Sequence, residues 1–145
     1  MFRKSLASLA LASVVGCSAS SSFQPFASNG PDERAQAAAY AASSKYPEEM
    51  KVSEDFKAIA LINPKNESVK IVNYSDEPIR NANVWINRSF VYKAGTIPSH
   101  GSIVVDREQL YDASGETMQK LNAAANRVEV QVGEHLYRLG NARIE

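Results

Sequence analysis

Arg127-Val128-Glu129-Val130-Gln131-Val132 alternates polar and apolar side chains without a break. A period of two is typical of a strand with one buried face, because successive side chains of a strand point to opposite faces. Gly133 and Glu134 follow, and they suit a tight two-residue turn into a second strand over residues 135–139. This stretch therefore predicts a β-hairpin and a mainly β fold.

The chain before this hairpin supplies further short strands, each bounded by residues that favour turns. Asn87 can adopt the left-handed backbone conformation that a tight hairpin requires. The expected strands cover residues 58–63, 69–74, 84–86, 90–92 and 102–106. Seven short strands in all predict an antiparallel, immunoglobulin-like β-sandwich, with a small β-barrel as the alternative. Trp85 resembles the core tryptophan of immunoglobulin domains, but the paired cysteines are absent, so this likeness concerns architecture alone.

An alanine-rich segment precedes the strands and is expected to be helical from Pro31 to about Tyr46. Gly30 can cap this helix, Pro31 fits its first position, and Pro47 should end it. Its only large apolar side chains are Tyr40 and Tyr46, so we expect the helix to dock loosely or to stay in solvent.

A second, short helix is expected late in the chain, over residues 116–126. In this interpretation Met118, Leu121 and Ala125 face inward. The preceding residues 112–115 form a turn.

The N-terminal residues have the layout of an export signal. Arg3 and Lys4 provide positive charge, the stretch from Ser5 to Val15 is apolar, and Val14-Val15-Gly16-Cys17 ends it. A membrane-spanning helix would need about 20 apolar residues, so this stretch is too short to span. An ordinary signal peptide with a chance cysteine is the other alternative.

The ending V-V-G-C resembles the lipobox of bacterial lipoproteins. This resemblance implies removal of residues 1–16 and acylation of Cys17, which would hold the protein at a membrane. It also implies transport to the outer membrane, facing the periplasm, because Ser18 rather than Asp follows the cysteine. The expected organisation is a signal peptide (1–16), a lipid anchor and flexible tether (17–31), an Ala-rich helix (32–47) and a β-sandwich domain (48–145).

The charge balance gives no reason to expect a nucleic-acid partner. The chain has 16 basic and 16 acidic residues, and loss of Arg3 and Lys4 leaves 14 − 16 = −2. No run of basic residues offsets this balance. The mature domain would contain no cysteine for disulfides, because Cys17 is the only one.

The sequence offers little for catalysis, and no cofactor is expected. His100 and His135 are the only histidines, and both lie in or beside predicted turns, where they are expected to face solvent. A nucleophile with a base and an orienting third group is not evident. Asp106, Glu108 and Asp112 lie close together but lack the spacing of a calcium loop, so we expect Asp106 and Asp112 to cap turns and expect no metal site.

Aromatic residues on the strands are the remaining candidates for a functional contact. If Val84 and Ile86 face the core, Trp85 points outward, where it could contact a ligand or partner together with Tyr92. The alternative is that Trp85 is buried, under the Ala-rich helix or in a strand covered on both faces. The sequence thus predicts a lipid-anchored, non-catalytic envelope domain with a structural or protein-interaction role. The alternative is a glycan-binding or enzyme-inhibitory module.

Overall fold

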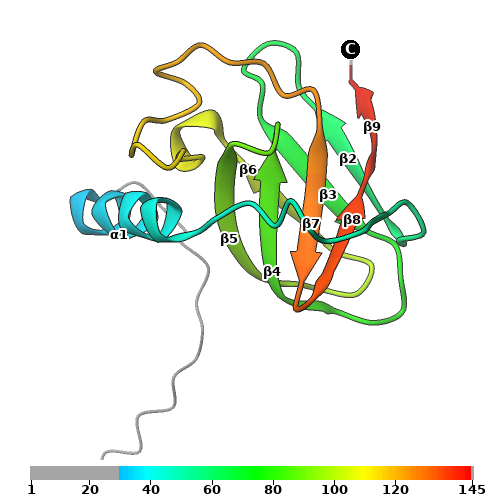
Figure 1. Ribbon diagram of the computed structural model, residues 1–145. Helices are drawn as coiled ribbons and strands as arrows, with labels where there is room; N and C mark the ends of the chain where they lie inside the picture. Colours follow the sequence, from blue (N-terminus) through cyan, green and yellow to red (C-terminus); the bar gives the residue numbers. More distant parts are fainter. Residues whose placement is uncertain (1–29, 145) are drawn as a thin grey trace, which may run out of the picture.

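The computed structural model describes residues 30–144 (Figure 1). Residues 1–29, with the predicted anchor at Cys17, therefore lie outside the described part of the chain. Within it, the chain forms the helix α1 (Pro31–Ser43), the short 3-10 helix η1 (Arg107–Gln109) and nine strands. The strands are β1 (Val52–Ser53), β2 (Ala58–Ile62), β3 (Val69–Asn73), β4 (Ile79–Ile86), β5 (Phe90–Ile97), β6 (Ser102–Val105), β7 (Val128–Val132), β8 (His135–Arg138) and β9 (Gly140–Arg143).

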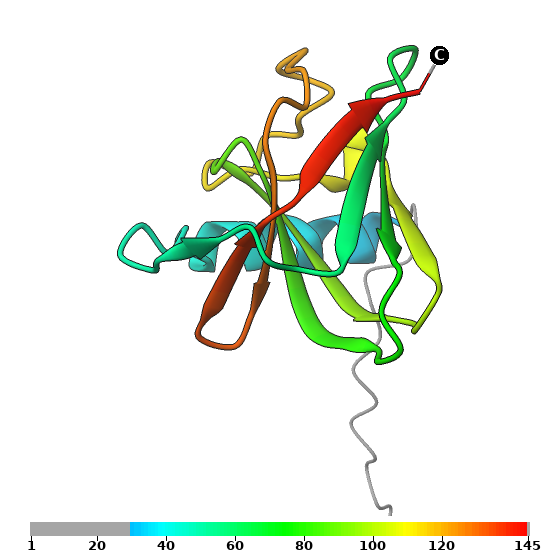
Figure 2. The ribbon, with the colours of Figure 1, turned by 90° about the vertical axis from the view of Figure 1, so that its right-hand side faces the viewer.

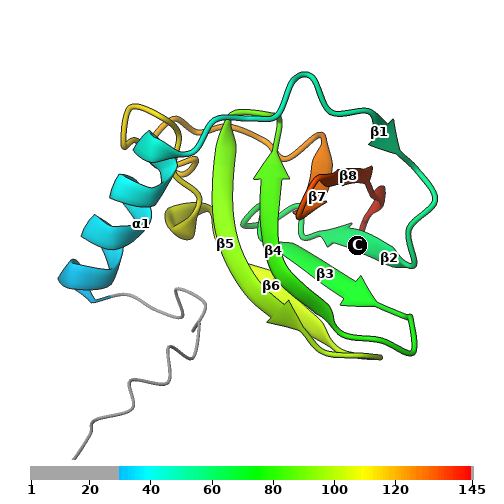
Figure 3. The ribbon, with the colours of Figure 1, turned by 60° about the horizontal axis from the view of Figure 1, so that its bottom comes forward.

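Two sheets pack face to face and confirm the expected mainly β, sandwich-like fold (Figures 1 and 3). One sheet has the order β1-β8-β7-β4-β5 and the other the order β6-β3-β2-β9. The hairpins β2–β3, β4–β5 and β7–β8 join neighbours in the sequence, as the turn residues predicted. At the β4–β5 turn, Asn87 and Arg88 adopt left-handed φ angles of 53° and 61°.

The expectation that all strands pair antiparallel is wrong, and so is the count of seven. β1 pairs in parallel with β8, where Val52 lies opposite Leu136, and β2 pairs in parallel with β9. Both extra strands are short. The chain runs from β8 into β9 through Leu139 without reversing, so it leaves one sheet and joins the other (Figure 2). The resulting mixed sheets differ from the antiparallel sheets of an immunoglobulin-like sandwich.

The core lies between the sheets and follows from the alternation along the strands. In β2, the buried residues are Ala58, Ala60 and Ile62, and the residues between them face outward. Val128 and Val130 of β7 reach the same core from the other sheet. The loop after β6 contributes Leu110, Met118 and Ala125, which are also buried here.

The segment 116–126 forms turns and not the expected helix. The N–H of Asn122 donates to the carbonyl of Gln119 at 3.0 Å and that of Ala123 to the carbonyl of Met118 at 3.1 Å, so neither bonds the residue four positions earlier as in an α-helix. Asn122 then takes a left-handed φ of 48°, which interrupts any right-handed helix. Met118 and Ala125 are buried as expected, whereas Leu121 is 51% exposed, so its inward orientation was wrongly predicted.

The helix α1 begins at Pro31 after Gly30, as predicted, but ends at Ser43, before the expected Tyr46. The hydroxyls of Ser43 and Ser44 both donate to the carbonyl of Tyr40, at 3.0 and 2.7 Å. Ser44 itself is extended, with φ −95° and ψ 129°. Serine hydroxyls that bond the last carbonyls compete with continued helix, and here they end it.

Candidate functional site

Trp85 points away from the inter-sheet core, as the alternation along β4 predicted. It does not reach solvent, because α1 and the segment after it cross the outer face of the five-stranded sheet (Figures 1 and 3). Trp85 is only 3% exposed. The interpretation that places it on the surface is therefore wrong, and the alternative of burial under the Ala-rich helix is confirmed. Alanine side chains allow this close approach, and Ala41 is fully buried against the cluster.

The residues around Trp85 form a second apolar cluster, which we call the outer-face cluster. Its buried members are Ala41, Trp85, Val91, Tyr111 and Leu136. Half-buried residues packed against them come from α1 and from the segment that leads to β1, namely Ala37, Ala38, Tyr40, Tyr46, Met50 and Val52. The helix that was expected to dock loosely or to stay in solvent is thus part of a packed layer.

Tyr92 lies on the other side of the same sheet. It is 7% exposed and belongs to the core between the two sheets, so the structure does not bring it together with Trp85. Burial raises the pKa of the Tyr92 phenol, and the carboxylate of Asp106 adds to this effect. The predicted surface formed by Trp85 and Tyr92 is therefore corrected to two separate, buried positions.

A polar network lies beside the outer-face cluster, centred on the fully buried carboxylate of Glu129. Arg127 donates to Oε1 of Glu129 from Nε at 2.8 Å and from Nη2 at 2.5 Å. The Tyr46 hydroxyl donates to Oε2 of the same carboxylate at 2.9 Å. The Trp85 indole N–H donates to Oε1 of Gln131 at 2.9 Å. Each buried polar group of the network thus has a partner, as a buried carboxylate requires.

The network fixes Tyr46 in its neutral form. Burial, followed by the hydrogen bond to Glu129, raises the pKa of the Tyr46 phenol. The hydrogen bond to Glu129 likewise raises the pKa of Arg127. Tyr46 also packs edge-on against Trp85, with 5.4 Å between ring centroids. These contacts hold the segment after α1 against the sheet.

Several open hollows lie on the described surface. One, of about 540 Å³, is lined by the end of α1, by Tyr46, Trp85 and Arg88 and by the turn at residues 112–114. The Arg88 guanidinium lies over the Tyr46 ring at 5.6 Å from its centroid. A smaller hollow of about 190 Å³ includes Phe56 and Tyr137, whose rings stack on each other at 4.1 Å.

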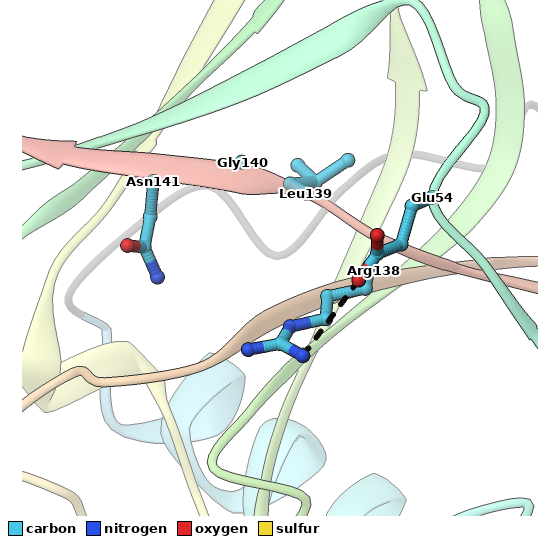
Figure 4. A pocket seen from close by; sticks show the side chains of 5 residues that line it. All are labelled: Glu54, Arg138, Leu139, Gly140 and Asn141. Atoms are coloured by element: carbon cyan, nitrogen blue, oxygen red, sulfur yellow. Dashed lines mark ion pairs between the residues drawn. The ribbon is translucent and has the colours of Figure 1, made fainter.

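A third hollow, of about 380 Å³, lies where β8 passes into β9 (Figure 4). Arg138 and Glu54 face each other there, with 3.8 Å between Nη1 and Oε1. Both side chains are substantially exposed, so the pair contributes little to stability. Its other lining residues are Leu139, Gly140 and Asn141, which supply no reactive group.

The titratable residues singled out from the sequence remain apart. His100 and His135 are exposed, as expected, and His100 Nε2 lies 2.9 Å from Asp76 Oδ1. Asp112 Oδ1 accepts the N–H groups of Ser114 and Glu116 and so caps its turn as predicted. Asp106 precedes η1, but its side chain makes no capping hydrogen bond, and its own N–H donates to Gln109 Oε1 at 3.0 Å. Within residues 30–144, no three His, Cys, Asp or Glu side chains lie close enough to hold a metal ion.

A search of the described helices found none that is long and apolar enough to span a membrane. No protein-family model matches the chain, and no curated protein or solved structure is significantly similar to it.

Proposed function

We propose that this protein is a lipid-anchored domain of the bacterial cell envelope with a structural or protein-interaction role and no catalytic activity. One observation carries the proposal, namely the order of the N-terminal residues. A basic pair, an apolar stretch and V-V-G-C precede a segment of small polar residues and then a folded domain.

The anchor would act through acyl chains on Cys17. One chain holds a protein only marginally, whereas two or three, at about 0.8 kcal/mol for each buried methylene, hold it firmly. The 13 residues that follow Cys17, up to Gly30, would span at most about 45 Å when extended. The domain is therefore expected to stay within this distance of the bilayer. The residue after the cysteine, Ser18, favours transport to the outer membrane.

The domain itself supports an interaction role more than a ligand-binding one. A glycan would need an accessible aromatic face, and Trp85 lies beneath α1. The hollow next to Trp85 is open. Ligand sites usually have a few polar groups that converge on the ligand, whereas in this hollow Arg88 lies over the ring of Tyr46. A non-catalytic domain that presents its surface to other envelope components fits these features best.

The test is the substitution Cys17→Ala in the full chain. We expect the wild-type protein in the membrane fraction, with a mature N-terminus that begins at acylated Cys17. The variant should be found outside the membrane fraction. The melting temperature of the variant should match that of the wild-type protein, because position 17 lies outside the β-domain. Mass spectrometry of the N-terminus and fractionation of envelopes measure both results.

Two matched variants complete the experiment. Ser20→Ala changes a small residue three positions later and should leave acylation and membrane retention unchanged. Ser18→Asp should keep the acyl chains but move the protein to the inner membrane. An unmodified sulfur at Cys17, or an intact leader in the wild-type protein, would contradict the proposal.

A further inference from the structure

The outer face of the four-stranded sheet lacks the cover that the other sheet has. Within residues 30–144 no helix or strand packs on it, and Figure 2 shows α1 behind the sandwich while β2 and β9 lie in front. The strand registers place its outward side chains in two rows across the sheet. We call these residues the open sheet face: Gly140, Ile59, Val72 and Ser102 in one row, and Ala142, Leu61, Lys70 and Val104 in the other.

The open sheet face is apolar, although the solvent side of a two-layer β-protein is normally polar. Ile59, Leu61 and Val72 are only half-buried, and Val104 is 54% exposed. Ile144 continues β9 at one margin, where its N–H donates to the carbonyl of Ile62 at 3.0 Å. These apolar side chains are accessible to a protein partner or a membrane.

An exposed tyrosine extends the face at its opposite end. Tyr74, 54% exposed, follows Val72 by two residues and so points to the same side. Its N–H donates to the carbonyl of Lys57 at 3.1 Å, which continues the β2–β3 ladder by one pair. The Tyr74 hydroxyl donates to the carbonyl of Phe56 at 3.3 Å. An exposed tyrosine ring at the margin of an apolar surface suits a membrane–water interface.

The charges of this surface have one sign. Lys70 lies within the open sheet face, Lys57 lies beside Tyr74, and both are exposed. The carboxylates nearest in sequence to the ends of β2, β3 and β6 are those of Asp55, Glu67, Asp76 and Asp106. Glu67 pairs with Arg143 and Asp76 pairs with His100. None of the four lies in the two rows of the open sheet face. The face is therefore complementary to an anionic apolar surface.

The size and charge of the face argue against a second copy of this chain as its occupant. Four strands about 4.8 Å apart and two rows of residues cover roughly 300 Å². A stable interface between two proteins needs about 800 Å² from each partner. A two-fold contact would also bring Lys70 of both copies into the same apolar interface, whose centre normally lacks charges.

We propose that the open sheet face docks on the anionic lipid surface to which Cys17 is anchored. The apolar side chains enter the headgroup layer, and the lysines extend their ammonium groups to lipid phosphates. This inference rests on the proposed anchor, which holds the face close to the membrane and so makes a weak contact effective. The tether length allows the domain to turn this face to the bilayer.

The experiment uses the full lipidated chain in vesicles of equimolar phosphatidylethanolamine and phosphatidylglycerol. Because acylation occupies the only native cysteine, Val104→Cys introduces one free thiol for an environment-sensitive fluorophore. Leu121→Cys is the matched control, since Leu121 is a similarly exposed apolar residue away from this face. Trp85 emission verifies that both labelled chains are folded.

We expect the Val104 label to shift its emission to the blue and to be protected from iodide, while the Leu121 label stays accessible. Lys57→Gln and Lys70→Gln should each lower the ratio of docked to undocked protein about fivefold. In vesicles of phosphatidylcholine alone, the label at position 104 should also be less protected from iodide.

The contradicting outcomes are distinct from one another. A chain that does not float with the vesicles contradicts the anchor, and with it the proposed function. A chain that floats with both labels equally accessible contradicts the docking and leaves the anchor in place. Protection of the Val104 label that disappears when the protein is diluted in the membrane shows a second copy on the face, and it would overturn the proposal.

Discussion

Glu129 shows how a single buried charge organises the surface around it. Its carboxylate is fully buried, and its two oxygens accept hydrogen bonds from Arg127 and Tyr46. Replacing both partners of such a pair by apolar groups can be harmless, whereas removing one leaves a buried charge without compensation. Alternation along β7 had placed Glu129 on the outward face, and nothing in that pattern indicated that another segment would cover it.

We therefore expect Arg127→Ala to lower the free energy of unfolding by about 3 kcal/mol. Lys120→Ala is the control, because it removes the exposed ion pair between Lys120 and Glu116 and should cost at most about 0.5 kcal/mol. Urea unfolding at neutral pH measures both. Equal losses in the two variants would show that the buried network contributes no more than a surface pair.

The helix α1 acts as the cover of one sheet, and a single small residue decides whether it fits. Ala41 is the buried residue of α1, whereas Ala39 on the same helix is exposed. A carboxylate at position 41 would have to be desolvated against the Trp85 cluster, so the helix should detach instead.

Ala41→Glu is expected to shift the emission of Trp85, the only tryptophan, to the red and to open it to soluble quenchers. The free energy of unfolding should fall by about 2 kcal/mol as the apolar contact is lost. Ala39→Glu makes the same change on the solvent side of α1 and should leave the emission unchanged. Emission spectra with acrylamide titration distinguish the two, and a red shift in both variants would argue against a specific docking of Ala41.

The elements that local signals define were predictable from the sequence. Gly133 predicted the β7–β8 turn, and Asn87 predicted the β4–β5 turn, because few residues adopt left-handed backbone at low cost. The strands β1 and β9 were missed. They are short, and β9 with Gly140-Asn141-Ala142-Arg143 has no large apolar residue that alternates. Their pairing depends on partners distant in sequence, which no local pattern contains.

The candidate site was predictable only in part, for a related reason. The period of two gave the direction of Trp85 correctly but not what lies over it, since that depends on where α1 returns in space. The position of Tyr92 was predicted wrongly. Both faces of β5 are covered, so several consecutive residues of this strand are buried and burial along it does not alternate. Ile59 and Leu61 of the open sheet face alternate with buried residues along β2. The sequence does not indicate that this side of the sheet is left uncovered, so the face could be identified only from the structure.

The two sheets are joined at Leu139, where the chain passes from one to the other. Its side chain is buried at the junction between β8 and β9. We expect Leu139→Ala to lower the free energy of unfolding by about 2–4 kcal/mol, because a cavity would open where the sheets meet. Leu121→Ala, at an exposed position, should cost about 0.5 kcal/mol or less. Thermal or urea unfolding compares them, and similar values for both leucines would mean that the junction is not part of the cooperative core.

The passage of the chain from β8 into β9 also governs when this molecule can fold. Residues 135–143 supply the neighbour of β1 and one of the two neighbours of β2, so two early strands cannot complete their pairing before these residues are made. During synthesis from the N-terminus, the early strands emerge before those partners and cannot complete either sheet. Such late closure delays the native state until residues 135–143 have been made.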